Sequence, residues 1–224
     1  MRKFLSVLML ALLLLLAGCD TPTDPGYFII TDADGNLVTI DAATGAVPTI
    51  EYEYHEIHEG DSFSCWYLQD VAGIGNRSII TFRTPDTDRW VHVTVTFSAT
   101  VMAHGRIYEA PAVTDDTGAP LDIFNRDRNS ATTSTVWDTS PVIDVQNQAT
   151  YFTVATMGNV VPGIEIAHMH LGTGEGKKTI GGDQRGAQEW ILEQNTLYAF
   201  EIESVNADAN THVITLDWYE HTNN

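Results

Sequence analysis

The chain has 224 residues, of which 30 are acidic and 11 basic, so its formal net charge is −19 at neutral pH. Such an acidic surface repels phosphate groups, which argues against nucleic acid or anionic lipid head groups as partners of the folded domain. The length suffices for one large β-domain or two small ones, and the two cysteines allow at most one disulfide.

The first nineteen residues have the pattern of an export signal. A positively charged start precedes an apolar run from Phe4 to Leu16. This run is too short to span a bilayer comfortably, and small residues follow it, which is typical of a secretory signal peptide. The segment Leu16-Ala17-Gly18-Cys19 resembles the lipobox of bacterial lipoproteins. The resemblance covers only residues 1–19, and it implies that Cys19 is acylated and becomes the new N-terminus.

Removal of residues 1–18 would leave 206 residues with nine basic and 30 acidic side chains, a net charge of −21. We expect the protein to be exported and held on a bacterial membrane by the acyl chains of Cys19, on its periplasmic or cell-surface side. Because an acylated Cys19 cannot form a disulfide, Cys65 has no partner within the chain. We expect Cys65 to be a buried small hydrophobe, not a reactive thiol.

Two short segments precede the main domain. Residues 19–26 are polar and contain two prolines, so we expect an extended tether. Residues 27–50 predict a small β-meander, because short apolar runs alternate with Asp-Gly and Thr-Gly turns. The D-x-D-x-N spacing that begins at Asp32 resembles a calcium loop, but the glycine and glutamate that such a loop needs are missing. A plain hairpin turn is the interpretation we favour.

Residues 51–224 predict an all-β domain, an antiparallel β-sandwich of which the jelly roll is one form. The clearest alternation runs from Trp90 to Phe97, where every second residue is apolar. Other apolar runs predict strands at 78–82, 106–110, 131–137, 151–156 and 164–170. The last two strands, at 198–202 and 214–218, point alternate side chains into one core, and we expect them to form a closing hairpin. The one helical signal is a turn near 186–192.

His168 and His170 lie two residues apart on the strand predicted at 164–170, and therefore share one of its faces. Imidazole pairs bind copper or zinc, and Met102 and His104 offer a thioether and a further imidazole, a ligand set that suits copper. The sequence does not show that these segments meet, and a tight site needs a third or fourth ligand. We therefore expect no tightly bound metal, and keep a copper or zinc site at His168 and His170 as the alternative.

Two other motifs resemble functional patterns but lack required residues. The histidines of His55-Glu56-Ile57-His58 are three apart, whereas zinc proteases need them four apart on a helix, and the nearby aromatic residues favour an extended or looped segment. The segment 172–179 resembles a phosphate-binding loop, but Leu171 and Lys178 replace a glycine and a hydroxyl residue, which favours a flexible surface loop. No Gly-x-Ser-x-Gly elbow or recognisable carboxylate pair marks a catalytic site.

These patterns favour a non-enzymatic binding or structural module, lipid-anchored at the bacterial cell envelope. Its first candidate binding loops are Asn125–Ser130 and Gly172–Gly186. Its expected partners are the lipid bilayer, through Cys19, and a protein of the envelope or cell surface. Two alternatives stay open: an envelope metal-binding protein that uses His168 and His170, and an envelope enzyme whose site the sequence does not reveal.

Overall fold

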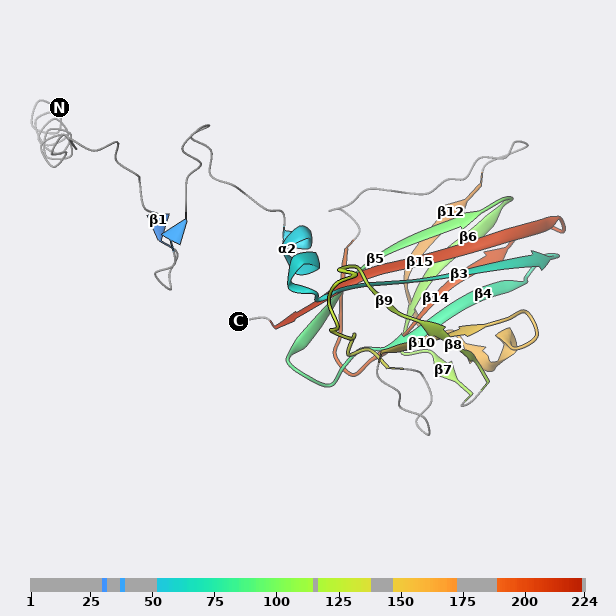
Figure 1. Cartoon of the computed structure of the whole chain (residues 1–224). Coiled ribbons are helices and arrows are strands. Elements are labelled where there is room, and N and C mark those ends of the chain that lie inside the picture. The colour runs from blue at the N-terminus through green and yellow to red at the C-terminus, as the bar shows by residue number, and fades with distance from the viewer. Residues whose placement is uncertain are drawn as a thin grey trace, which may run out of the picture. The chain divides into compact units, whose positions relative to one another are not determined.

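The computed structural model describes residues 30–31, 37–38, 52–114, 117–137, 147–172 and 189–222 (Figure 1). The chain divides into two compact units, Met1–Ile50 and Glu51–Asn224. In the first unit, β1 (Ile30–Thr31) pairs antiparallel with β2 (Leu37–Val38). The lipobox, the polar tether and the calcium-like motif at Asp32 lie outside the described residues.

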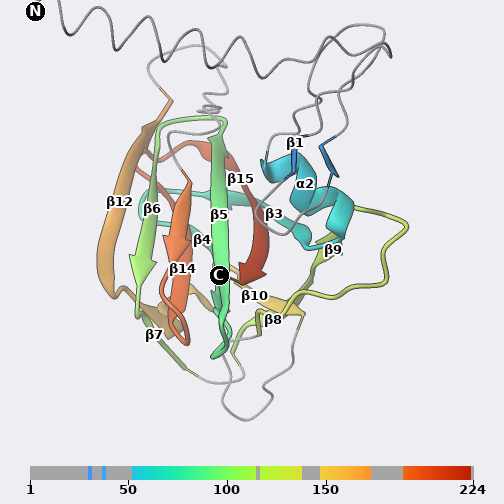
Figure 2. The same ribbon diagram turned by 90° about the vertical axis from the view of Figure 1, so that its left-hand side faces the viewer.

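The second unit is a sandwich of two antiparallel sheets, which confirms the predicted all-β class (Figures 1 and 2). The six-stranded sheet has the order β12 (Ile164–Leu171), β6 (Ala103–Glu109), β14 (Leu197–Ser204), β4 (Arg77–Arg83), β10 (Gln148–Phe152), β8 (Ala119–Asp122). The five-stranded sheet has the order β13 (Trp190–Leu192), β5 (Arg89–Ala99), β15 (Ala209–Thr222), β3 (Ser62–Ala72), β9 (Phe124–Asn125). The unit also contains a short pair, β7 (Ala112–Val113) with β11 (Val160–Val161), and the 3-10 turn η1 (Met157–Asn159).

The strand order interleaves two parts of the chain. Strands β3 to β6 alternate between the two sheets, and β12 to β15 do the same. Strand β15 lies between β3 and β5, while β14 lies between β4 and β6. This is the strand arrangement of a jelly roll. It places β12 beside β6, a pairing that Figure 2 shows at one side of the sandwich.

The hydrophobic core lies between the two sheets. The alternation predicted for β5 is confirmed, since Val91, Val93, Val95 and Phe97 are all buried. The inward faces of the last two long strands contribute large, fully buried side chains, which are Tyr198, Phe200 and Ile202 of β14 and Ile214, Leu216 and Trp218 of β15. A core of this size stabilises the sandwich without a disulfide.

The prediction that the last two strands pair as a hairpin is wrong. Strand β14 pairs with β4 and β6, whereas β15 pairs with β3 and β5. The turn between them, where the Asn206 side chain accepts a hydrogen bond from the Asp208 amide at 2.9 Å, crosses from one sheet to the other. The predicted inward faces are correct, but they meet across the core and not within one sheet. Alternation determines which face of a strand is buried, and it does not determine the strand's partner.

The segment that contains His55 and His58 is helical, which corrects the prediction of an extended or looped segment. Helix α2 covers Tyr52–Glu59. It ends at Gly60, whose φ is 82°; the Asp61 amide donates to the Glu56 carbonyl at 3.0 Å and the Gly60 amide to the Ile57 carbonyl at 3.1 Å. These two bonds form a Schellman cap, for which glycine is the preferred residue.

Three other predicted segments also differ. The expected strand at 131–137 is irregular except for an isolated bridge between Trp137 and Arg83. The buried carboxylate of Glu220 holds this segment, since it accepts hydrogen bonds from the hydroxyls of Ser134 and Thr135 and from the Thr135 amide. The strand expected at 151–156 ends at Phe152, and Trp190–Leu192, expected to be helical, is strand β13.

Candidate metal centre

The register between β6 and β12 determines which side chains meet at this side of the sandwich. His170 pairs directly with His104, and His168 pairs with Arg106. The neighbouring residues Ile107 and Leu171 lie on the opposite faces of these strands, where they point into the core and are buried. Because side chains alternate along a strand, His104, Arg106, His168 and His170 share the outer face of the six-stranded sheet.

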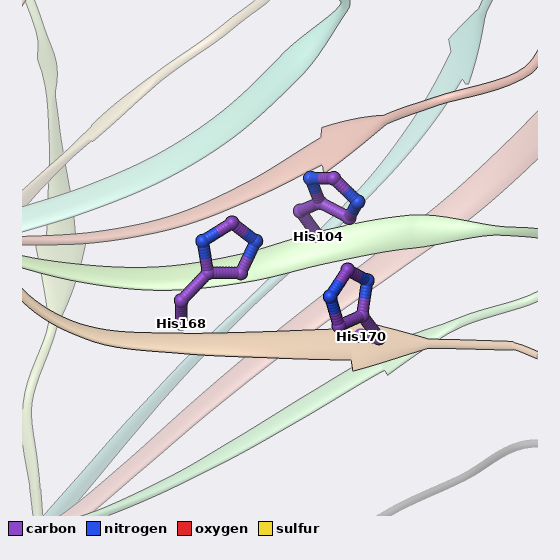
Figure 3. Close-up of side chains that lie close together, drawn as sticks. All are labelled: His104, His168 and His170. Atoms are coloured by element: carbon purple, nitrogen blue, oxygen red, sulfur yellow. The ribbon is translucent and has the colours of Figure 1, made fainter.

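The three imidazoles form a cluster (Figure 3). One nitrogen from each of His104, His168 and His170 lies within 4.8 Å of the others. The ring centroids are 4.8 Å apart for His104 and His168, 4.7 Å for His104 and His170, and 5.2 Å for His168 and His170. Among the described residues, this is the one group of three or more His, Cys, Asp or Glu side chains with such spacing. A tetrahedral ion with metal–nitrogen distances of about 2.0–2.1 Å holds its nitrogens about 3.3 Å apart, so the rings would have to move closer together to bind one ion.

A β-bulge adds a carboxylate to this face. The register shifts between Glu165 and Ala167, so that Glu165 lies on the same face as His168 although the two residues are three apart. In a regular strand, residues three apart point to opposite faces. The bulge lets His168 Nδ1 donate to Glu165 Oε1 at 3.0 Å, which leaves the Nε2 lone pair of His168 available to a metal.

Arg106 connects the imidazoles to three carboxylates. Its Nη1 donates to Glu201 Oε1 at 3.0 Å and also to Glu203, and its Nε lies 3.6 Å from Glu165 Oε2. Its Nη2 lies 3.0 Å from His104 Nδ1. Glu201 is buried and also accepts a hydrogen bond from Arg77 at 2.9 Å, so this network is fixed to the sheet.

Local electrostatics favour a neutral His104. Burial lowers its pKa, and the neighbouring Arg106 guanidinium and the imidazoles of His168 and His170 lower it further, against a smaller opposing effect of Glu203. The neutral form of histidine is the form that binds metals. Three imidazoles suit Cu²⁺ and Zn²⁺, and a site with three protein ligands leaves a coordination position open to water.

The structure brings together His104, His168 and His170, the three imidazoles that the sequence marked as candidates. Met102 lies one residue before β6 with a side chain that is 48% exposed. Neither Glu165 nor Arg106 was recognisable from the sequence as part of the site. Alternation could have placed Arg106 on the face of His104, but the position of Glu165 depends on the bulge, which leaves no clear pattern in the sequence.

The remaining motifs lie elsewhere or outside the described residues. His55 and His58 belong to α2, where His55 Nε2 lies 3.7 Å from Glu59 Oε1, one helical turn away. Cys65 is buried as predicted. Burial raises the pKa of its thiol, and the negative charge of the nearby Asp217 raises it further. Hydrogen bonds hold the loop Asn125–Ser130 against the domain, among them one from the Asn125 side chain to the Gly60 carbonyl at 2.7 Å. Residues 173–188, most of the second candidate loop, are outside the described part.

Comparison with protein-family models, with curated proteins and with solved structures finds no match to this chain. No helix among the described residues is long and apolar enough to cross a bilayer.

Proposed function

We propose that this protein is a lipid-anchored component of the bacterial cell envelope that binds one copper or zinc ion through His104, His168 and His170. The observation that carries the proposal is the convergence of these imidazoles from two paired strands. Two histidines on one strand are too few ligands for a specific metal site, and His104 supplies the third.

The ion would be cargo and not a structural element. The three histidines lie on the outer face of the sheet, while the core between the sheets is filled by apolar side chains. A fold that is complete without the ion does not depend on it for stability, in contrast to small zinc domains. The side chain of His168 is 37% exposed, so the ion would be accessible to other ligands and could be exchanged.

The charge of the chain supports capture of cations. The mature protein carries a net charge of −21, Glu165 is hydrogen-bonded to His168, and Glu203 pairs with His104 across β14 and β6. A negative surface raises the local concentration of divalent cations and their rate of arrival. Acylation of Cys19 would keep this site close to the membrane surface.

The experiment titrates the untagged full chain in detergent with Zn²⁺, with binding measured by calorimetry and the bound ion counted by metal analysis. We expect one equivalent of bound ion, and loss of this binding in His168→Ala/His170→Ala. The matched control is His55→Ala/His58→Ala, which removes two histidines from α2 outside the cluster and should retain the binding. If the wild type binds no ion, or if both double variants bind equally, the metal-binding function is wrong and a binding or structural module is the better account.

A further inference from the structure

We infer that Arg106 competes with the metal for His104, so that binding at the proposed site requires Arg106 to release this imidazole. The inference rests on the proposed metal-binding function and concerns how the site is regulated. It follows from the different partners of two of the three histidines.

The partner of His168 prepares it as a ligand. Glu165 can only accept a hydrogen bond, so the bond at 3.0 Å assigns the proton of His168 to Nδ1. The lone pair of Nε2 is then free to face the other imidazoles. Removal of this carboxylate would leave the tautomer and the orientation of the ring undetermined.

The partner of His104 has the opposite effect. A guanidinium has five donors and no acceptor, so His104 Nδ1 must accept the bond from Arg106 Nη2 at 3.0 Å. A neutral His104 then carries its proton on Nε2. One nitrogen is occupied by Arg106 and the other is protonated, so His104 is unavailable to a metal while this bond exists.

Arg106 can release His104 without leaving its place. Its Nη1 remains bonded to Glu201 and Glu203, and its Nε remains near Glu165. Only the bond from Nη2 has to break. The arginine therefore opposes the ion in two ways, through its positive charge and through its hold on one ligand. The second effect multiplies the intrinsic affinity by the fraction of molecules in which His104 is free.

The test is the affinity for Zn²⁺ of the full chain in detergent, measured by calorimetry in wild type and in Arg106→Gln. We expect the variant to bind at least about tenfold more tightly, because it lacks both the charge and the competing donor. The matched control is Arg77→Gln, which removes the same charge from the same Glu201, while the side-chain hydrogen bonds of Arg77 to described residues go to Glu201, Met157 and Val160. It should change the affinity by less than about threefold.

Two further variants separate the release of His104 from a general effect of the arginine's charge. In a His104→Ala background, the gain from Arg106→Gln should shrink to the part that comes from the arginine's charge, because there is no ligand left to release. Arg106→Lys is the second measurement if the glutamine variant does not fold. Its single ammonium, attracted to Glu201 and Glu203, should leave His104 free and increase the affinity about threefold.

The outcomes are distinguishable. Equal affinities of wild type, Arg106→Gln and Arg106→Lys at a site that needs the histidines would overturn the inference alone. No binding by any of these proteins would overturn the proposed function as well.

Discussion

The imidazoles of His104 and His170 lie directly opposite each other on paired strands, with ring centroids 4.7 Å apart, although 66 residues separate them in the chain. The pairing of β6 with β12 produces this contact, and the two-residue spacing of His168 and His170 then adds the third imidazole. The candidate site is therefore a property of the sheet register. A shift of one residue in this register would move the histidines of β12 to the opposite face from His104.

Truncation of Trp218 should destabilise the sandwich strongly. Its ring is buried, and its centroid lies 6.0 Å from the ring centroid of Phe63 and 5.6 Å from that of Phe82. We expect Trp218→Ala to lower the free energy of unfolding by about 3–5 kcal/mol, measured by urea denaturation. Trp66→Ala is the control, because the Trp66 side chain is 55% exposed and should contribute little. Similar losses for the two variants would show that the assigned core is wrong.

Glu220 should hold the irregular segment 131–137 against the sandwich. Its carboxylate accepts hydrogen bonds from Ser134, Thr135 and the Trp218 indole, the last at 3.1 Å. In Glu220→Gln the amide NH₂ replaces an acceptor and leaves a buried donor unsatisfied, so stability should fall by about 2 kcal/mol and the segment should become easier to cleave by protease. Glu59→Gln, at a side chain that is 62% exposed, should match the wild type in both assays.

These two cases show what the sequence could and could not provide. Alternation in β5, β14 and β15 predicts which side chains are buried, because burial follows from local polarity. It does not predict that β14 and β15 lie in different sheets, nor that the apolar run at 131–137 is bound through Glu220. Strand partners and buried polar contacts depend on residues far apart in the chain, and a single sequence does not reveal them.

The same limit applies to the candidate site. The pair His168 and His170 was recognisable from its spacing, whereas the position of His104 depended on the pairing of β6 with β12. Glu165 was missed because its place depends on a bulge. The helix at 52–59 was missed for a different reason, since its aromatic residues suggested an extended segment, although Gly60 after it is a typical C-terminal helix signal.

The stability of the protein should fall as the pH is lowered below neutrality. His212 is buried between the hydroxyls of Ser78 and Ser204, and burial lowers its pKa to about 4 from an ordinary value of 6.5. Between these values the unfolded chain binds a proton that the folded chain does not, so stability decreases as pH falls through this window. We expect a loss of about 2 kcal/mol between pH 7 and pH 5 from this residue.

The measurement is urea unfolding at several pH values in wild type and His212→Gln. The variant should lose less stability than the wild type over this range, whatever its stability at pH 7. Parallel curves for the two proteins would mean that another group causes the acid sensitivity.

The thiols report on both lipidation and folding. If Cys19 is acylated and Cys65 is buried, the mature native protein has no thiol that reacts quickly with Ellman's reagent, and one thiol reacts after denaturation. Labelled palmitate should also enter the wild type and be absent from Cys19→Ser. A fast thiol in the native protein that persists in Cys65→Ala, together with no incorporated label, would show that Cys19 is not acylated.

The most direct test of the metal site counts its imidazole ligands. The full chain, with ¹⁵N-labelled histidine, is loaded with one equivalent of Cu²⁺ and studied by electron paramagnetic resonance. We expect coupling to three imidazole nitrogens in the wild type, to two in His104→Ala, and to three in the control His55→Ala/His58→Ala. Spectra without histidine nitrogen coupling, or spectra that do not change when His168 and His170 are replaced, would contradict it.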